Sequence, residues 1–502
     1  MLKRNIVFLA SLLLGLPFVV LGVLAPGHFE AATSALHSLI IDKFGWGYLI
    51  SATIFLLFPL VLAFSRYGDL KLGKDYEKPQ YSYFGWFSML FAAGMGIGLI
   101  FWGVAEPLSH FNAPSGGIAP RTPEAAQFAM QFSFFHWGLH PWAIYITMGL
   151  AIAYFSFRRG MPPLISSCFF PLLGTRIHGA AGYAIDVLAV FATVFGIATS
   201  LGMGALQITS GLAEVTPLRD SMMLTLGIIA VVTVLFMLSS ATGLDTGIQM
   251  LSKANLLIAL VLLLFLLVVG PTAYIMDVFT TTLAGYASSL VTMSLSTNPF
   301  QGYEWTKDWT LFYWAWWISW SPFVGLFVAS ISRGRTVREF ILGALLVPSL
   351  LTFFWFSVFG GAAFHVQFVG EGAGADIAQA TSNDVSTALF ALFAHYPLTN
   401  VLTVLALILL IVFFVTSADS ATYVLSMMTS NGNLAPPLWK KVVWGVFQAS
   451  AAAALIFSGG LVALQKMAIA AALPFTLVML LLCLSLHRAM KYELDIEQPG
   501  TK

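Results

Sequence analysis

Charged residues are scarce in this chain, and their scarcity limits the kind of protein it can be. Only 9% of the 502 residues are Asp, Glu, Lys or Arg, and 59% are hydrophobic. A soluble domain carries roughly 25% charged residues. The composition therefore excludes an ordinary soluble domain and predicts a polytopic integral membrane protein. The net charge of +1 implies no acidic or basic partner, and no basic stripe indicates nucleic acid binding.

Cysteines and catalytic motifs are also scarce. Cys168 and Cys483 fall in or beside apolar segments without metal-ligand spacing, and no disulfide can be inferred from them. The chain has no phosphate-binding loop, no HExxH motif and no G-x-S-x-G motif on a strand–helix turn. We therefore expect neither an enzyme nor a cofactor, and energy for transport would have to come from an ion gradient.

Long hydrophobic segments predict an all-α fold with twelve membrane-spanning helices. A segment must be about 20 residues long to cross a bilayer core of roughly 30 Å. We expect such helices near 6–24, 48–64, 86–106, 128–155, 184–209, 221–240, 254–275, 311–331, 340–364, 397–428, 440–457 and 465–486. The first resembles a signal peptide but has no small-residue cleavage site, so a first spanning helix fits better.

Basic residues are distributed unequally between the predicted loops. If the N-terminus is cytoplasmic, eighteen Lys and Arg residues lie on the inside and five on the outside. The positive-inside rule then predicts a multi-pass protein with both termini in the cytoplasm. The short basic loop 332–339 (SRGRTVRE) either enforces this topology or contributes to gating or contact with membrane lipid.

Tryptophan is concentrated in residues 308–327, which contain five of them. On a helix, one continuous aromatic stripe would consist of Phe312, Trp316, Trp320, Phe323 and Phe327. Trp316 and Trp320 lie too deep for an interfacial belt, whereas Trp309 could belong to one. Two interpretations remain open from residue types: aromatic helix packing, or a cage whose indole faces attract an onium cation that has no N–H to donate.

A second aromatic group lies in the segment near 128–155. Trp137, Trp142 and Tyr145 could close the cage from the opposite side. His136 and His140 form an i, i+4 pair, but no acidic or cysteine partner completes a metal site. We therefore expect ordinary buried or interfacial histidines there.

Two predicted spans carry features of broken helices. Gly94, Gly96 and Gly98 alternate in the third span, a spacing that differs from the usual small-residue packing motif. Freed carbonyls at such a break would face a cavity. In the span near 397–428, the hydroxyls of Thr416 and Ser417 either bind a hard cation such as sodium or bond their own i−4 carbonyls.

Three blocks of the chain resemble signatures of the betaine/carnitine/choline transporter family, and the similarity extends over essentially the whole chain. The blocks are 308–317 (DWTLFYWAWW), 94–98 (GMGIG) followed by 101–107 (FWGVAEP), and 416–420 (TSADS). The resemblance implies a LeuT-type fold, usually assembled as a homotrimer. Residues 1–85 would hold two extra helices and a basic loop, 86–275 the first five-helix repeat (helices 3–7), 276–486 an outer loop and the inverted second repeat (helices 8–12), and 487–502 a short tail.

The resemblance also implies which residues bind substrate and ions. The substrate site would consist of Trp137, Trp142, Tyr145, Trp316, Trp317 and Trp320, with Phe312 adjacent and with Gly94, Met95 and Gly98 approaching the substrate. One sodium site would use Ala92, Met95, Phe413, Thr416 and Ser417. A second would retain Thr193 and Phe323, but Ile197 replaces its second threonine, so we expect this site to be altered.

These inferences favour a symporter of the bacterial inner membrane that imports glycine betaine or a related onium solute by alternating access. Proton-coupled choline carriers of the family often have Asp where this chain has Gly98, which favours a zwitterionic substrate and sodium as coupling ion. Proton-driven choline transport and dimethylsulfoniopropionate or carnitine transport remain alternatives. A channel is disfavoured by the aromatic centre, and an osmosensor by the short tail.

Overall fold

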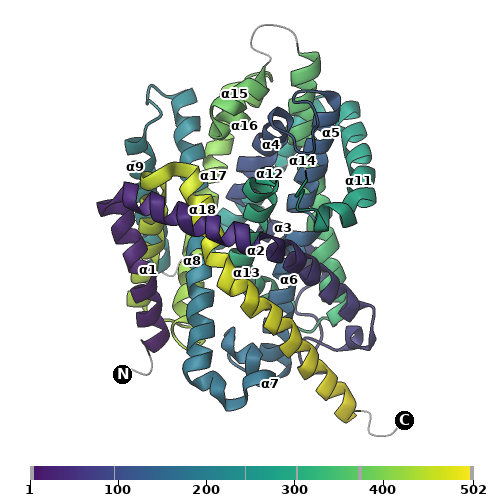
Figure 1. Cartoon of the computed structure of the whole chain (residues 1–502), viewed down its shortest axis with the longest axis vertical. Helices are drawn as coiled ribbons and strands as arrows, with labels where there is room; N and C mark the ends of the chain where they lie inside the picture. The colour runs from purple at the N-terminus through teal and green to yellow at the C-terminus, as the bar shows by residue number, and fades with distance from the viewer. Residues whose placement is uncertain (1–4, 95, 243–244, 301–302, 371–375, 498–502) are drawn as a thin grey trace.

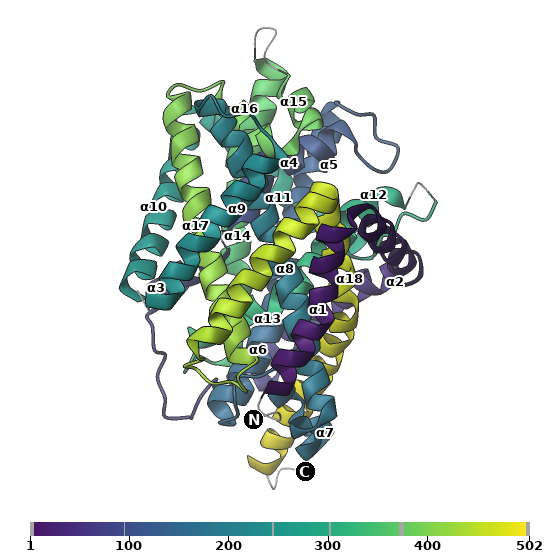
Figure 2. The same cartoon turned by 90° about the vertical axis from the view of Figure 1, so that its left-hand side faces the viewer.

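The computed structural model describes residues 5–94, 96–242, 245–300, 303–370 and 376–497, apart from the side chains of residues 91–94, 241–242, 245–250 and 496–497. These residues form helices, and the single extended pairing among them is an isolated bridge between Lys71 and Thr336. Most helices run along the long axis of the molecule, whereas α2 crosses it obliquely (Figure 1). The start of α1 and the end of α18 lie at the same end (Figures 1 and 2).

The longer helices follow one another along the chain, and the connections between them range from one or two residues to segments that contain short helices. Those before residue 216 are α1 (Ile6–Leu24), α2 (Pro26–Ala63), α3 (Tyr83–Gly94), α4 (Ile97–Asn112), α5 (Pro123–Trp137), α6 (Leu139–Ala153) and α8 (Ala180–Val215). The later ones are α9 (Met222–Thr242), α10 (Asp245–Val269), α11 (Thr272–Leu295), α13 (Phe312–Ser330), α14 (Val337–Val369), α17 (Thr399–Met428) and α18 (Leu438–Glu497). Short helices fill several connections: η2 (Arg66–Asp69), η3 (Tyr154–Arg158), η4 (Ser166–Phe169), α7 (Phe170–Leu173), η5 (Gly174–His178), α12 (Glu304–Thr306), η6 (Lys307–Leu311), α15 (Ile377–Asn383), η7 (Val385–Thr387) and α16 (Ala388–Phe393).

Within the described ranges, nine helices are long and apolar enough to cross a membrane, which shows a multi-pass membrane protein. α18 joins the predicted segments 440–457 and 465–486 across a kink at Gly459 and Gly460. Gly460 has φ +62°, a conformation that glycine adopts without steric cost. The predicted segments 86–106 and 128–155 are each divided into two shorter helices, so the number of twelve spans stays a prediction.

The predicted break in the third span is confirmed. α3 ends at Gly94, and α4 begins at Ile97 after Gly96, whose extended backbone (φ −130°, ψ −178°) cannot continue a helix. A second break, which the sequence analysis did not predict, separates α5 from α6 at Gly138 (φ −97°, ψ −124°). Both breaks lie beside the same cavity, described below.

The predicted break in the span near 397–428 is wrong, because α17 is continuous from Thr399 to Met428. The Thr416 hydroxyl donates to the carbonyl of Val412 at 2.8 Å. Such an i−4 bond lets a hydroxyl residue sit inside a helix without opening it. No glycine or proline lies between residues 413 and 420 to interrupt the backbone.

The tryptophan-rich α13 lies at the centre of the helix bundle, where it packs against α6, α8 and α18. Small residues permit this close approach. A methyl group built on Gly196 of α8 would lie 3.1 Å from the Ser319 side chain, and one on Gly149 of α6 would lie 3.0 Å from the Gly325 carbonyl oxygen. α13 is therefore held in place on several sides, which fixes the directions of its indoles.

The basic loop 332–339 contacts the segment that follows α2. The N–H of Leu72 donates to the Arg335 carbonyl, and the N–H of Gly334 donates to the Leu72 carbonyl, both at 2.8 Å. Arg333 makes two hydrogen bonds to Glu77, at 2.8 and 2.9 Å, and these hold the pKa of that carboxyl below its usual value. This part of the loop is thus engaged in protein contacts.

Arg335 is the buried arginine of this loop. Its side chain is 1% exposed, lies 4.0 Å from the ring centroid of Trp86, and donates to the Tyr81 carbonyl at 2.9 Å. Arg335→Ala is expected to destabilise the protein by about 2 kcal/mol or more, because a charged hydrogen bond and a cation–π contact are lost together. The measurement is the thermal unfolding midpoint of the purified protein in detergent. The control is Arg333→Ala, which removes an exposed ion pair and should cost at most about 1 kcal/mol; equal losses would contradict the prediction.

Candidate functional site

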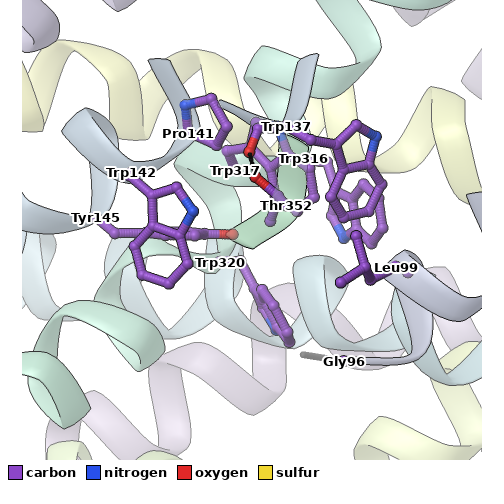
Figure 3. Close-up of a pocket in the computed structure, with 11 residues that line it drawn as sticks. Gly96, Leu99, Trp137, Pro141, Trp142, Tyr145, Trp316, Trp317, Trp320 and Thr352 are labelled. Atoms are coloured by element: carbon purple, nitrogen blue, oxygen red, sulfur yellow. Dashed lines mark hydrogen bonds between the residues drawn. The ribbon is translucent and has the colours of Figure 1, made fainter. Parts of the chain in front are cut away.

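An aromatic cavity lies between α4, α5, α6, α13 and α14. It is lined by Gly96, Gly98, Leu99, Trp137, Pro141, Trp142, Tyr145, Trp316, Trp317, Trp320 and Thr352. Figure 3 shows Trp142 and Tyr145 on one side of this aromatic cavity, with Leu99 and Gly96 on the other. Trp137 ends α5, and the other two aromatic residues of the second predicted group belong to α6. The structure thus brings both predicted aromatic groups together around one space.

The aromatic rings of the cavity contact one another both by stacking and edge to face. The rings of Trp316 and Trp317 stack at a centroid distance of 4.4 Å and an interplanar angle of 18°. Trp137 meets Trp317 edge to face at 4.9 Å and 73°. Tyr145 meets Trp320 at 6.4 Å and 60°. Walls of this kind present ring faces from several directions, an arrangement that attracts a cationic group from all of them.

Hydrogen bonds to the surrounding protein orient three of the indoles. Nε1 of Trp316 donates to the Gly196 carbonyl at 3.3 Å, and Nε1 of Trp317 donates to the His136 carbonyl at 2.9 Å. Nε1 of Trp137 donates to Oε2 of Glu106 at 2.6 Å. Because these N–H groups are engaged by protein acceptors, the three indoles offer ring carbons and not donors to the cavity.

Two polar groups of the lining behave differently. In the described part of the chain, neither Nε1 of Trp320 nor the hydroxyl of Tyr145 has a hydrogen-bond partner, although both atoms are buried. A buried polar group without a partner carries a desolvation cost of about 1–3 kcal/mol. Both groups can donate to an acceptor that enters the cavity.

The start of α4 forms another part of the lining. Gly96, Gly98 and Leu99 all border the cavity. The N–H of Leu99 donates to the Gly96 carbonyl at 3.1 Å, and the helix dipole adds partial positive charge at this end. This edge of the cavity therefore suits an anionic group.

Gly98 is a point of close approach. A methyl group built on it would lie 2.6 Å from Cη2 of Trp316 and 3.0 Å from Cη2 of Trp137. A Cβ atom at 2.6 Å from a ring carbon would be a steric clash. Any residue other than glycine at this position would therefore displace the two indoles.

The cavity itself is small, with a volume of about 30 Å³. That space holds roughly two water molecules, whereas ligand pockets commonly measure about 300–1,000 Å³. A trimethylammonium group therefore requires the rings to move apart.

Three of the residues predicted to bind substrate are not found in the cavity lining, one because it lies outside it and two because the structure does not describe their surroundings. Phe312 does not line the cavity. Its ring stacks on the ring of Trp316, with a centroid distance of 5.6 Å and an interplanar angle of 13°. Gly94 is the last residue of α3 but its surroundings fall outside the description, and Met95 lies outside the described residues.

The structure describes only part of the first predicted sodium site. Phe413, Thr416 and Ser417 lie on α17, whereas Met95 and the side chain of Ala92 fall outside the description. Ile97 of α4 and Phe414 of α17 both approach Gly204, where an added methyl group would lie 3.0 and 3.4 Å from them. The start of α4 therefore lies near the middle of α17, where the resemblance implies that the sodium ligands meet.

At the second predicted sodium site, the Thr193 hydroxyl is bonded within its own helix in the same way as that of Thr416. Thr193 on α8 donates to the Ala189 carbonyl at 2.7 Å, and Phe323 on α13 packs against Trp320 at 5.8 Å. Ile197, which stands where the family has a second threonine, is 1% exposed within the protein interior. The expectation that this site is altered stays a prediction.

The sequence analysis was wrong about the partners of His136. It found no acidic partner nearby in sequence, but Glu106, thirty residues earlier, lies 2.7 Å from Nδ1 of His136. Intramembrane acids are functional candidates by default, so Glu106 in the predicted third span could have been singled out on that ground. Thr352 of α14, which donates to the Trp137 carbonyl at 2.9 Å, had no comparable signal.

Comparison with known proteins agrees with this architecture. The profile described as "BCCT, betaine/carnitine/choline family transporter" matches residues 6–495. The Bacillus subtilis glycine betaine transporter OpuD is 49% identical over 95% of this chain and 92% of its own length. An ectoine/hydroxyectoine transporter of Virgibacillus pantothenticus is 42% identical over 99% of this chain and 98% of its own length, and glycine betaine transporter 1 of Vibrio parahaemolyticus is 42% identical over 95% and 91%. With an all-helical membrane fold and relatives named as transporters rather than enzymes, this chain belongs to the betaine/carnitine/choline transporter family.

Proposed function

We propose that this protein is a secondary active symporter that imports glycine betaine or a closely related zwitterionic onium solute, driven by sodium. The observation that carries the proposal is the aromatic cavity, which combines indole faces, two unpartnered donors and a helix N-terminus. The similarity to two glycine betaine transporters supports the substrate class.

The two ends of a betaine molecule match different parts of the cavity. Its trimethylammonium group has no N–H to donate, and the faces of Trp316, Trp317 and Trp137 offer it cation–π attraction. Its carboxylate can accept hydrogen bonds from Tyr145 and Trp320, or lie at the start of α4. Choline has no carboxylate, so this combination favours the zwitterion.

Transport would proceed by alternating access around this cavity. We propose twelve spans with two inverted repeats and two preceding helices, and a homotrimer in the bacterial inner membrane with both termini in the cytoplasm. The break between α3 and α4 supports the proposal, since interrupted helices at a central site are typical of secondary transporters. Coupling requires that sodium and substrate together bind one conformation better than another, because equal affinity for both shifts nothing.

Uptake into proteoliposomes tests the proposal. Purified protein is reconstituted, and uptake of labelled glycine betaine, ectoine, carnitine, dimethylsulfoniopropionate and choline is measured with sodium and proton gradients imposed separately. We expect saturable betaine uptake that depends on an inward sodium gradient. Uptake of choline driven by protons, with no response to sodium, would instead support the alternative.

Thr416→Ala tests the coupling ion. Sodium prefers oxygen ligands, and the Thr416 hydroxyl can accept a cation on its lone pairs while donating to the Val412 carbonyl. We expect the sodium concentration for half-maximal betaine uptake to rise at least roughly tenfold, equivalent to about 1.4 kcal/mol. Thr416→Ser retains the hydroxyl and should retain the sodium affinity within a few-fold. An unchanged sodium dependence in Thr416→Ala would show that this hydroxyl does not hold the coupling ion.

A further inference from the structure

A fully buried carboxylate lies directly behind the wall of the aromatic cavity. Glu106 of α4 is 0% exposed, and four side chains converge on it. Oε1 accepts from Nδ1 of His136 at 2.7 Å and lies 3.2 Å from Nε2 of His110. Oε2 accepts from Nε1 of Trp137 at 2.6 Å and from the hydroxyl of Tyr313. One side chain thus joins α4, α5 and α13 behind the cavity.

The donor pattern matches an ionised carboxylate. An indole N–H can only donate, so Trp137 requires a lone pair on Glu106. His136 can donate from Nδ1 because its other nitrogen, Nε2, lies 2.9 Å from the Thr310 hydroxyl, which can donate to it. If His110 and Tyr313 also donate, four donors occupy the four lone-pair sites of the carboxylate and no proton is needed on it.

Glu106, His110 and His136 also resemble a metal site, since their ligand atoms lie within 4.8 Å of one another. Two observations favour the hydrogen-bonded carboxylate instead. The 2.7 Å separation of Oε1 and Nδ1 is that of a charge-assisted hydrogen bond. Trp137 and Tyr313 occupy the other oxygen. A metal cation here would also place positive charge behind a wall that attracts cations.

Of the four donors to Glu106, one is part of the wall of the aromatic cavity and another packs against that wall. Trp137 lines the cavity. Tyr313 packs against Trp137 at 5.7 Å and stacks on Trp317 at 5.8 Å and 28°. The carboxylate therefore determines where these rings lie. Its negative charge also attracts a cation across the intervening ring, since a charge in a water-poor interior is weakly screened. In addition, an indole whose N–H donates to an anion has a more electron-rich ring face.

We propose that Glu106 is a positioning residue that also sets the charge specificity of the aromatic cavity. Held ionised by its four donors, it fixes Trp137 and Tyr313 and supplies the negative charge that distinguishes a cationic ligand from an uncharged group of the same shape. This inference rests on the proposed function, that the cavity binds an onium solute, and goes beyond it by assigning the discrimination to a residue that does not touch the ligand.

The test compares two ligands and two variants. Glycine betaine has a carbon isostere, 3,3-dimethylbutyrate, in which a tert-butyl group replaces trimethylammonium. Glu106→Gln removes the negative charge and keeps the shape of the side chain. Its amide oxygen still accepts from Trp137 and Tyr313, and its NH₂ group can donate to the histidines in their other tautomer. Glu106→Asp retains the charge but shortens its reach.

Equilibrium binding to purified protein gives the readout. We expect Glu106→Gln to weaken betaine binding roughly tenfold or more, given a unit charge within about 10 Å in a poorly screened interior. The isostere should bind to this variant no more weakly than to the original chain, so the ratio of betaine affinity to isostere affinity should fall by at least the same factor. Glu106→Asp is expected to weaken both ligands while keeping their ratio within a few-fold.

Other outcomes separate the possible failures. If Glu106→Gln weakens both ligands equally, Glu106 has a structural role alone and the inference is overturned; the same holds if neither affinity changes. If Glu106→Gln fails to fold in a thermal unfolding assay, Glu106→Asp decides, because a collapsed affinity ratio with the charge retained contradicts the inference. If the original chain does not bind betaine, the proposed function fails, whatever the variants do.

Discussion

Trp320→Ala is expected to lower the affinity for glycine betaine by at least roughly 30-fold and to abolish measurable uptake at low substrate concentration. A desolvated cation–π contact contributes about 2 kcal/mol or more, and Trp320 also carries an unpartnered Nε1 that can donate to the substrate carboxylate. The measurement is a binding titration on purified protein, followed by uptake in proteoliposomes.

Two control variants separate ligand binding from folding. Trp320→Phe retains an aromatic face but loses the N–H, so an intermediate loss is expected. Trp46→Ala removes a tryptophan that is 58% exposed and remote from the lining, and it should leave uptake near that of the original chain. Betaine affinity that is unchanged in Trp320→Ala would remove α13 from the substrate site as we describe it.

Gly98→Ala is expected to reduce betaine uptake at least roughly tenfold while the protein still folds. The new methyl group would lie 2.6 Å from Trp316 and 3.0 Å from Trp137. Overpacking of this kind costs about 1–3 kcal/mol, and here the groups that must move are two walls of the cavity. The effect should therefore fall on the Michaelis constant for betaine more than on the unfolding midpoint.

Gly227→Ala is a matched control for that substitution. Gly227 lies in the interior of α9, and a methyl group built there meets nothing within 4 Å. Uptake and stability should both be retained, because alanine favours a helix by up to about 1 kcal/mol relative to glycine. Normal betaine uptake by Gly98→Ala would show that the two indoles can withdraw without loss of binding.

The features that could be predicted from the sequence depend on local periodicity. The spacing of Trp316 and Trp320 follows the turn of a helix, so their shared face can be predicted without any tertiary structure. The same holds for the break at Gly96, because alternating glycines remove the side chains that a helix interior normally has. Long apolar runs likewise predicted a multi-pass membrane protein, whereas the number of spans depends on where the helices break.

The features that were missed or wrong depend on contacts between distant segments. Glu106 and His136 are thirty residues apart, and only the packing of α4 against α5 brings them to hydrogen-bond distance. α17 stays whole because Thr416 satisfies its hydroxyl within the helix, one of two alternatives that the residue type left open. The turn at Gly138 was not predicted, since a single glycine in an apolar run is compatible with an unbroken helix.

The small volume of the aromatic cavity has a bioenergetic consequence. The cavity has room for roughly two water molecules. It would therefore carry little water if the protein switched between its outward-open and inward-open forms without substrate. A chain of hydrogen-bonded waters, along which protons cross membranes, needs more space than this cavity offers. In this contracted form the cavity is therefore a poor passage for water and for protons.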